Sequence, residues 1–305
     1  MKALVTGAAG FIGGYLITQL LEEGFQVVAF DLAPEPPDLQ KMSDRITYIR
    51  GDLGSDVDLY RTMAAEGITD VFHLGALLAE ACEANPLGAF RVNFHSTQVL
   101  LDAAAALGIN RFVMLSSISV FGRDVTEPVA DDARKNPETV YGQTKLACEH
   151  LMRWYARKHG VDTRALRLTW VFGPGRIRGI TALYSSRILD AFARLETLEI
   201  PNRHERGDWL YIKDAIKAIM RVWRVDAAPQ RIYNIAGGVH TIGDVVEIAR
   251  SLRPEAPVTL SEESKTLSPY PAAYDDTPAR RELGWVPDYD IETAVREHIA
   301  IVSGN

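Results

Sequence analysis

Three glycines at a spacing of three, Gly7, Gly10 and Gly13, follow an apolar strand pattern and open an amphipathic helical pattern. Such a turn is suited to phosphate, because a helix N-terminus presents free N–H groups and the positive end of its dipole. Gly7 permits the tight turn, Gly10 lets the backbone approach a pyrophosphate, and Gly13 lets the helix pack on the strand. The segment predicts a dinucleotide cradle that includes Phe11 and Ile12, in preference to a glycine-lined turn without a ligand.

An acidic residue follows the second predicted strand. Asp31 stands where a carboxylate accepts the ribose hydroxyls of adenosine. That carboxylate repels a 2′-phosphate, and the following Leu32-Ala33-Pro34 offers no cation to hold one. We therefore expect NAD in preference to NADP as the cofactor, with Asp31 and Leu32 beside the ribose.

Composition is consistent with a globular enzyme. With 305 residues, 47% of them hydrophobic, the chain can bury a large core. A net charge of −7 without a basic run argues against nucleic acid as a partner. No apolar stretch reaches the roughly 20 residues of a membrane span, and the N-terminus does not resemble a signal peptide. Cys82 and Cys148 lie in no metal-ligand pattern, so no metal is predicted. The expected location is the cytoplasm.

Strand and helix patterns alternate through the first half of the chain. The predicted strands are Lys2–Thr6, Gln26–Phe30, Ile46–Arg50, Asp70–Leu74, Arg111–Leu115 and Thr163–Leu168. The predicted helices are Phe11–Glu23, Asp56–Glu66, Leu87–Leu107 and Tyr141–His159. This alternation predicts an α/β fold, a Rossmann-type doubly wound parallel sheet with helices on both faces.

The pattern changes after the loop at Gly173-Pro174-Gly175. Helical patterns then dominate, at Thr181–Leu195, Lys213–Trp223, Thr241–Ser251 and Ile291–Val302, with short strands such as Arg231–Ile235. We expect residues 1–175 to form the cofactor-binding domain and residues 176–305 a smaller, closely packed substrate-binding region.

Two separated motifs predict the catalytic chemistry. Tyr141 and Lys145 are four residues apart, so they lie on one face of a helix. A tyrosine with its ordinary pKa of about 10 is a poor base at neutral pH, but a neighbouring ammonium stabilises the phenolate and lowers that pKa. The second motif is a buried strand that ends in Ser116-Ser117, at the strand end where doubly wound sheets bind ligands. A serine there can hydrogen-bond a substrate oxygen while the tyrosine moves its proton.

In this order along the chain, the motifs resemble the extended short-chain dehydrogenases/reductases, also called the NAD-dependent epimerase/dehydratase family. The resemblance covers nearly the whole chain and rests on these segments: Thr6 to Gly13, Asp31, Gly51-Asp52-Leu53, His73-Leu74-Gly75-Ala76, Val92-Asn93, Ser116-Ser117 with Val120-Phe121-Gly122, Tyr141 with Lys145, Tyr233 to Gly238, and Ala279 to Trp285.

The resemblance implies a role for each matching position. Tyr141 would be the general acid/base, Lys145 would tune it and bind the nicotinamide ribose, and Ser117 would orient the substrate hydroxyl. The remaining implied cofactor contacts are Asp52 and Leu53 beside adenine, and Leu74, Gly75, Ala76 and Asn93 along the cleft. Ser116 and His73 are interpreted as packed structural residues.

Three segments depart from the members that handle nucleotide sugars. Arg167-Leu168-Thr169-Trp170 lacks an asparagine found there, and Gly207-Asp208-Trp209-Leu210-Tyr211 and Lys265 to Pro271 lack arginines. A diphosphate in a partly dry pocket needs bidentate guanidinium partners. Arg206, one position away, is an alternative partner.

Other segments resemble the short-chain L-threonine dehydrogenases, among them His73 to Leu78 and Tyr274 to Arg280. We therefore expect NAD-linked oxidation of a secondary alcohol on a small polar molecule, with or without a carboxylate, and the candidates are L-threonine-like, uronate-like or related hydroxy compounds. The predicted substrate residues are Leu78, Ser117, Trp170, Arg176, Arg178 and Thr181, and one of the two arginines would meet a carboxylate. Solvated arginines and a core-filling Trp170 are the alternatives.

Two other functions stay open. An epimerase or dehydratase would use the same catalytic residues and recycle a tightly bound NAD, although Ile118-Ser119 lacks the carboxylates of a dehydratase. A non-catalytic NAD-binding protein would have lost the tyrosine or lysine. The resemblance also implies a homodimer that pairs helices 87–107 and 141–159, with Ala103 to Ala106 allowing close approach; these alanines could instead pack on the sheet.

Overall fold

The structure, a computed structural model, describes residues 1–261 and 268–304. The chain forms two compact units. Unit 1 consists of Met1–Val120, Pro137–Arg167 and Ala218–Tyr233, and unit 2 consists of Phe121–Asn136, Leu168–Lys217 and Asn234–Asn305. The units are therefore interleaved along the chain, whereas the sequence predicted one boundary near residue 175.

A seven-stranded parallel sheet in the order β10-β6-β5-β4-β1-β2-β3 forms the centre of unit 1. Its strands are β1 (Lys2–Thr6), β2 (Gln26–Asp31), β3 (Ile46–Arg50), β4 (Asp70–His73), β5 (Arg111–Ser117), β6 (Thr163–Leu168) and β10 (Ile232–Ile235). The first six confirm the predicted strands. Placing Arg231–Ile235 in the smaller region was wrong, because β10 hydrogen-bonds to β6 at the edge of this sheet.

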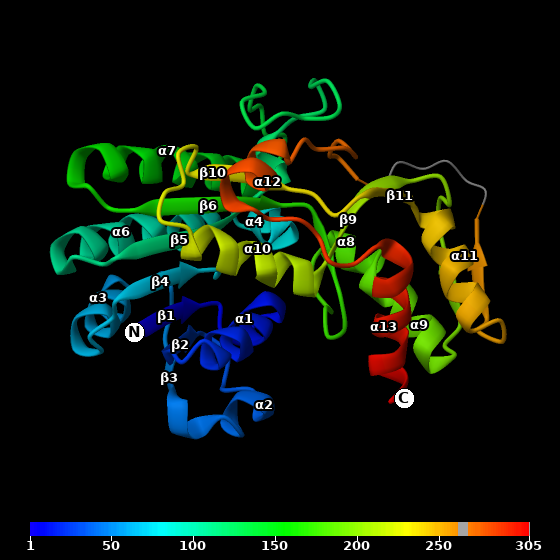
Figure 1. Ribbon diagram of the computed structural model, residues 1–305, viewed down its shortest axis with the longest axis horizontal. Helices are drawn as coiled ribbons and strands as arrows, with labels where there is room; N and C mark the ends of the chain where they lie inside the picture. Colours follow the sequence, from blue (N-terminus) through cyan, green and yellow to red (C-terminus); the bar gives the residue numbers. More distant parts are fainter. Residues whose placement is uncertain (262–267, 305) are drawn as a thin grey trace. The chain divides into compact units, whose positions relative to one another are not determined.

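Helices cover both faces of the sheet (Figure 1). They are α1 (Phe11–Glu22), α2 (Pro37–Gln40), α3 (Asp56–Ala65), α4 (Ala79–Ala84), α5 (Pro86–Ala89), α6 (Ser96–Leu107) and α7 (Val140–His159), with 3-10 turns η1 (Ser43–Arg45) and η3 (Ile118–Val120). The predicted helix Leu87–Leu107 is divided, because the π-helical segment η2 (Phe90–His95) separates α5 from α6.

Local chemistry sets the ends of the long helix α7. The Thr139 side chain accepts a hydrogen bond from the Gly142 N–H, and Gly160 ends the helix with a left-handed backbone at φ +69°. A Cβ on Gly142 would lie 2.1 Å from the Ser119 carbonyl oxygen. Glycine at this position therefore lets the first turn of α7 approach the chain that follows β5.

Unit 2 contains two small sheets and a group of helices. Its strands are β7 (Trp170–Phe172), β8 (Leu198–Ile200), β9 (Arg206–Tyr211), β11 (Val239–Thr241) and β12 (Val258–Leu260). They form one sheet in the order β11-β9-β7 and a β12-β8 pair. The helices are α8 (Ile180–Leu183), α9 (Ser186–Arg194), α11 (Ile242–Leu252), α12 (Thr277–Leu283) and α13 (Ile291–Ser303). Helix α10 (Ile212–Arg224) contributes residues to both units.

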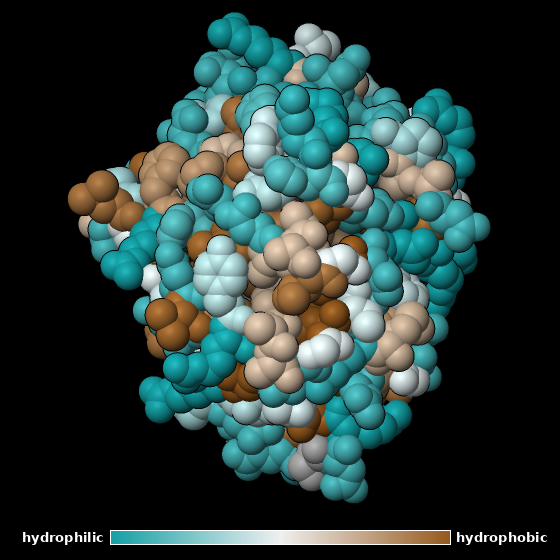
Figure 2. Space-filling view, turned by 90° about the vertical axis from the view of Figure 1, so that its left-hand side faces the viewer, coloured by the Kyte–Doolittle hydropathy of each residue, from teal (hydrophilic) through white to brown (hydrophobic). Residues whose placement is uncertain are grey.

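Two further features concern the surface. Across residues 1–261 and 268–304, no helix combines the length and the apolar character needed to cross a membrane. Figure 2 looks from the side at which α3, α6 and α7 end in Figure 1, and hydrophobic residues gather in the middle of this mostly hydrophilic face. Leu107, the last residue of α6, is one of the exposed hydrophobic side chains of unit 1.

Candidate active site

The glycine turn between β1 and α1 has the geometry of a phosphate cradle. Gly7 has φ +70°, and a Cβ there would lie 2.7 Å from the Gly75 Cα. A Cβ on Gly13 would lie 2.3 Å from the Gly7 carbonyl oxygen. Gly10 is exposed and caps α1 without a side-chain hydrogen bond. The turn thus leaves main-chain N–H groups at the start of a helix for an anion, which fits the diphosphate of a dinucleotide.

Asp31 links the end of β2 to this turn. Its Oδ2 accepts a hydrogen bond from the Ala9 N–H and its Oδ1 one from the Ala33 N–H, both at 3.0 Å. Residues 32–34 carry no cation, but the neighbouring strand supplies one. Arg50 on the neighbouring strand donates from Nε to the Leu32 carbonyl at 3.1 Å.

The loops after β3 and β4 meet beside the turn. The position of a Cβ on Gly75 lies 2.6 Å from Leu53 Cδ1, so Leu53 packs directly on the glycine. Thr6 fixes the second loop, because its carbonyl accepts from the Leu74 N–H and its Oγ1 from the Gly75 N–H, each at 3.2 Å. Asp52 Oδ1 accepts from the Gly54 N–H at 2.8 Å. The described structure therefore brings Leu53, Leu74 and Gly75 together with Gly7.

His73 is a packed residue, as interpreted from the sequence. The ring is 2% exposed and lies between Thr6 Oγ1 at 2.7 Å and Thr97 Oγ1 at 3.0 Å. Burial lowers the pKa of His73 to about 3, and the charge of Lys145 contributes in the same direction. The ring is neutral at physiological pH and holds β1, β4 and α6 together.

Asn93 lies in the π-helical segment η2, and its side-chain amide makes hydrogen bonds within unit 1. Oδ1 accepts from the Leu77 N–H at 2.7 Å, while Nδ2 donates to the Leu77 carbonyl at 3.1 Å and to Thr144 Oγ1 at 3.1 Å. The side chain therefore joins the loop before Leu78 to the helix that carries Tyr141. Leu78 is 39% exposed at the start of α4.

The three predicted catalytic residues come from β5 and α7. Ser117 ends β5, and its Oγ accepts from the Ser119 N–H at 3.1 Å. Tyr141 and Lys145 lie in the first two turns of α7, with Lys145 Nζ 5.7 Å from the centre of the Tyr141 ring. The Nζ donates to the Leu115 carbonyl at 2.8 Å. Burial lowers the pKa of Lys145.

A buried ion pair behind these residues was not predicted. Arg167 donates to both carboxylate oxygens of Glu149 at 2.8 Å, and Ser116 Oγ donates to Glu149 Oε1 at 2.6 Å. Arg167 and Glu149 are 0% and 3% exposed at their side chains. Ser116 is therefore structural, as interpreted. Glu149 lies one helical turn after Lys145 on α7, and no spacing in the sequence pairs it with Arg167 on β6.

In unit 2, the side chains at the positions that differ from nucleotide-sugar enzymes bond to other residues of the same unit. Thr169 Oγ1 donates to Asp208 Oδ1 at 2.9 Å, and Arg206 pairs with Glu127 at 3.5 Å. Of the third segment, Lys265, Thr266 and Leu267 lie outside the described residues.

The remaining predicted substrate residues lie in unit 2 and have different environments. Arg176 donates to the Val171 carbonyl and, at 2.6 Å, to Thr181 Oγ1, whereas Arg178 is exposed. Trp170 is 2% exposed, and a Cβ on Gly207 would lie 2.4 Å from its ring. Its observed environment is that of the core-filling alternative, and its contact with substrate stays a prediction.

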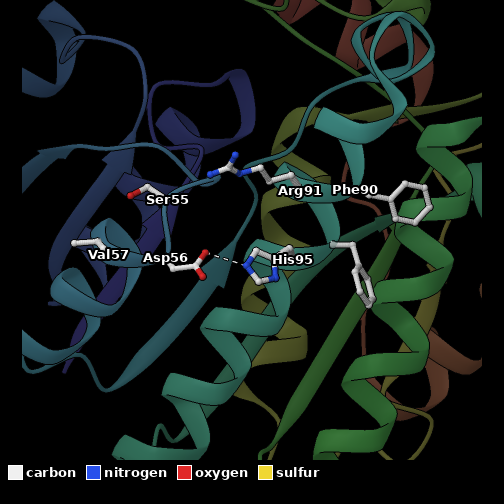
Figure 3. A pocket seen from close by; sticks show the side chains of 7 residues that line it. Ser55, Asp56, Val57, Phe90, Arg91 and His95 are labelled. Carbon is white, nitrogen blue, oxygen red and sulfur yellow. Dashed lines mark hydrogen bonds and ion pairs between the residues drawn. The ribbon is translucent and has the colours of Figure 1, made fainter.

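Each unit also has a cavity of its own. In unit 1, a cavity of about 630 Å³ lies between the start of α3 and η2, where His95 pairs with Asp56 at 2.9 Å (Figure 3). In unit 2, a cavity of about 420 Å³ is lined by residues that include Arg123, Arg206 and Tyr270. The predicted catalytic residues line neither cavity.

Comparisons with known proteins show which family the chain is similar to. Residues 3–236 match the NAD dependent epimerase/dehydratase family. The mitochondrial L-threonine 3-dehydrogenase of Sus scrofa is 28% identical over 96% of this chain and 80% of its own length. The UDP-glucose 4-epimerase of Corynebacterium glutamicum is 26% identical over 99% of this chain and 96% of its own. A solved structure of a partial consensus L-threonine 3-dehydrogenase matches with a TM-score of 0.91 and 26% identity over 100% of both chains.

The family match spans residues 3–236, which is more than half of the chain. The family's cofactor is NAD, and the glycine turn, which has no room for side chains at Gly7 and Gly13, fits its diphosphate. This chain therefore belongs to the NAD-dependent epimerase/dehydratase family, the extended short-chain dehydrogenases/reductases.

Proposed function

We propose that the protein oxidises a secondary alcohol of a small polar substrate, such as a hydroxy amino acid or a hydroxy acid, with NAD as the oxidant. The observation that carries the proposal is the placement of Ser117, Tyr141 and Lys145 at the end of β5 and the start of α7. The Lys145 bond to the Leu115 carbonyl fixes the two elements to each other in unit 1.

Each of the three residues has a role in this reaction. Tyr141 takes the proton of the substrate hydroxyl as general base, and Ser117 orients that hydroxyl by a hydrogen bond. The ammonium of Lys145 near the Tyr141 ring favours the phenolate. Bound NAD supplies the hydride acceptor.

A small substrate is supported by the side chains at the positions where a nucleotide diphosphate would need partners, because these side chains already bond to other residues of the chain. Thr169 is bonded to the buried Asp208, and Arg206 is paired with Glu127, so neither is arranged as a bidentate phosphate partner. The relative named L-threonine 3-dehydrogenase matches nearly the whole chain. We propose Arg178, the exposed arginine of its loop, as the partner of a substrate carboxylate.

An epimerase that retains and recycles its NAD is the second candidate. The match to a UDP-glucose 4-epimerase over 99% of the chain favours it, and Ser117, Tyr141 and Lys145 would serve both reactions. A dehydratase is less well supported, because Ile118 and Ser119 are buried and neither carries the carboxyl group that such an enzyme uses.

The deciding experiment follows NADH by its near-ultraviolet absorbance. Purified protein is mixed with NAD and a panel of L-threonine, other hydroxy acids, uronates and polyols. NADH formation by the parent, with a loss of about 100-fold or more in Tyr141→Phe, supports the dehydrogenase. Silence on the whole panel, with NAD copurifying, would favour the epimerase.

The Arg178 assignment has a separate test. With an acidic substrate from that panel, Arg178→Ala raises KM by about tenfold while kcat changes little, because a ground-state contact is lost. Arg187→Ala, at a partly exposed arginine that pairs with Glu196, is the control. An unchanged KM in Arg178→Ala would remove the assignment.

The proposed assembly of the enzyme is a homodimer.

A further inference from the structure

The ends of β2 and β3 place an arginine next to the acidic residue of the cofactor site. Asp31 and Arg50 are directly paired in the parallel register, and β3 is the edge strand of the sheet. Paired residues of neighbouring strands direct their side chains to the same face. The two opposite charges therefore stand side by side at the sheet edge where the ribose of the cofactor is expected.

Hydrogen bonds hold the guanidinium close to the segment that follows Asp31. Arg50 Nε donates to the Leu32 carbonyl at 3.1 Å, and Tyr48 Oη donates to the Ala33 carbonyl at 2.9 Å. Arg50 is exposed, and its Nη groups make no hydrogen bond within residues 1–261 and 268–304. They are available to an anion that replaces the solvent at this corner.

The electrostatics of Tyr48 are consistent with this placement. Burial and, to a smaller extent, the charges of Asp31 and Glu35 raise the pKa of Tyr48 to about 12, whereas the charge of Arg50 opposes the increase. One cation thus acts at this corner against two carboxylates.

We propose that Arg50 is a cofactor-specificity residue. It places a cation beside the ribose 2′ position, and the neighbouring carboxylate of Asp31 prevents this cation from holding the 2′-phosphate of NADP. The proposal rests on the NAD site of the family. Once the carboxylate of residue 31 is removed, the Arg50 guanidinium and the Ala33 N–H, which Asp31 otherwise occupies, can both donate to a 2′-phosphate.

Calorimetric titration with NADH and with NADPH tests this directly, since the two probes differ only in that phosphate. Asp31→Asn is expected to raise NADPH affinity by about tenfold or more, because a like-charge contact disappears. Adding Arg50→Met to Asp31→Asn should lower NADPH affinity by about fivefold and change NADH affinity less than about twofold. Arg61→Met, at an exposed arginine of α3, is the matched control and should change neither.

Salt and a second variant make the test sharper. The contribution of Arg50 should shrink as ionic strength rises, because its charge is exposed to solvent. If circular dichroism shows that Asp31→Asn folds poorly, Asp31→Ser replaces it. The NADPH affinity of Asp31→Ser should depend on Arg50 to the same extent. Equal NADPH affinity with and without Arg50 in both backgrounds would overturn the proposal while leaving NAD binding intact. A parent protein that fails to bind NADH would overturn the cofactor site as well.

Discussion

Asp208 is a carboxylate in the interior of unit 2, with 2% of its surface exposed. Its Oδ1 accepts hydrogen bonds from Thr169 Oγ1 and from the Gly237 and Gly238 N–H groups. Burial raises the pKa of Asp208 to about 6, although these hydrogen bonds oppose the increase. Because all three bonds go to one oxygen, an asparagine with its amide oxygen in that place can keep them.

Asp208→Asn is therefore expected to remove a pH dependence of stability. In the folded chain Asp208 binds a proton below about pH 6, and in the unfolded chain only below about pH 4. Between these values the folded state binds more protons, so the free energy of unfolding of the parent falls as the pH rises. Relative to the variant, the parent should lose on the order of 2 kcal/mol across this window. Urea unfolding at several pH values measures it, and a constant difference would contradict the account.

At the scale of the elements, the buried ion pair of Glu149 and Arg167 joins three of them. Glu149 lies on α7, Arg167 on β6 and Ser116 on β5, and their hydrogen bonds measure 2.6–2.8 Å. A charge that loses its partner in such a place is costly, whereas removal of both charges costs much less. The pair therefore ties α7, which carries Tyr141 and Lys145, to β6 and to the strand that ends in Ser117.

Arg167→Met is expected to destabilise the chain by about 3–5 kcal/mol, because it leaves the Glu149 carboxylate buried without a countercharge. The double variant Glu149→Gln, Arg167→Met should cost less than the sum of the two single changes. As a control, Arg296→Met breaks the exposed pair with Glu292 and should cost less than about 1 kcal/mol. Urea unfolding compares the four variants with the parent, and an Arg167→Met cost as small as the control would contradict a buried pair.

Local pattern predicted where the strands of unit 1 begin and end, but not every helix boundary and not how the elements associate. The six strands through Leu168 are found where apolar, β-branched runs predict them. The break between α5 and α6 was missed, because the apolar spacing continues through the π-helical segment η2, in which Asn93 makes its tertiary hydrogen bonds. The pairing of β10 with β6 was missed for a different reason, because a strand pattern does not indicate which strand will be its neighbour.

The candidate site shows the same limit. The glycine turn, Asp31, Ser117, Tyr141 and Lys145 stand in motifs whose spacing carries the chemistry. Arg50 and Arg167 became visible only through the register of β3 against β2 and the packing of β6 against α7. The roles of Arg50 and Arg167 depend on contacts between elements that are distant in sequence. The local pattern of a single sequence does not show such contacts.

For the molecule as a whole, the exposed and buried side chains of α5, η2, α6 and α7 indicate how copies of the chain assemble. Two of the alanines expected at a helix-pairing contact, Ala103 and Ala104, are 3% and 1% exposed, so they pack inside unit 1 as the alternative reading had it. Other apolar side chains are exposed on the same group of helices: Leu87 is 86% exposed on α5, Phe90 42% on η2 and Trp154 42% on α7. Large exposed apolar side chains on neighbouring helices are typical of protein contacts.

We therefore expect a homodimer that buries these side chains between two copies of α5, η2 and α7. Light scattering at micromolar concentration should give twice the chain mass of 33.8 kDa. Phe90→Asp with Trp154→Glu should give the single-chain mass with unchanged circular dichroism, because a charge facing its symmetry mate at a two-fold interface repels it. Leu195→Asp, at a residue of unit 2 that is 46% exposed, changes an apolar side chain away from these helices and should leave the dimer intact. A parent protein of single-chain mass would remove the dimer, and a double variant that still pairs would move the contact to another face.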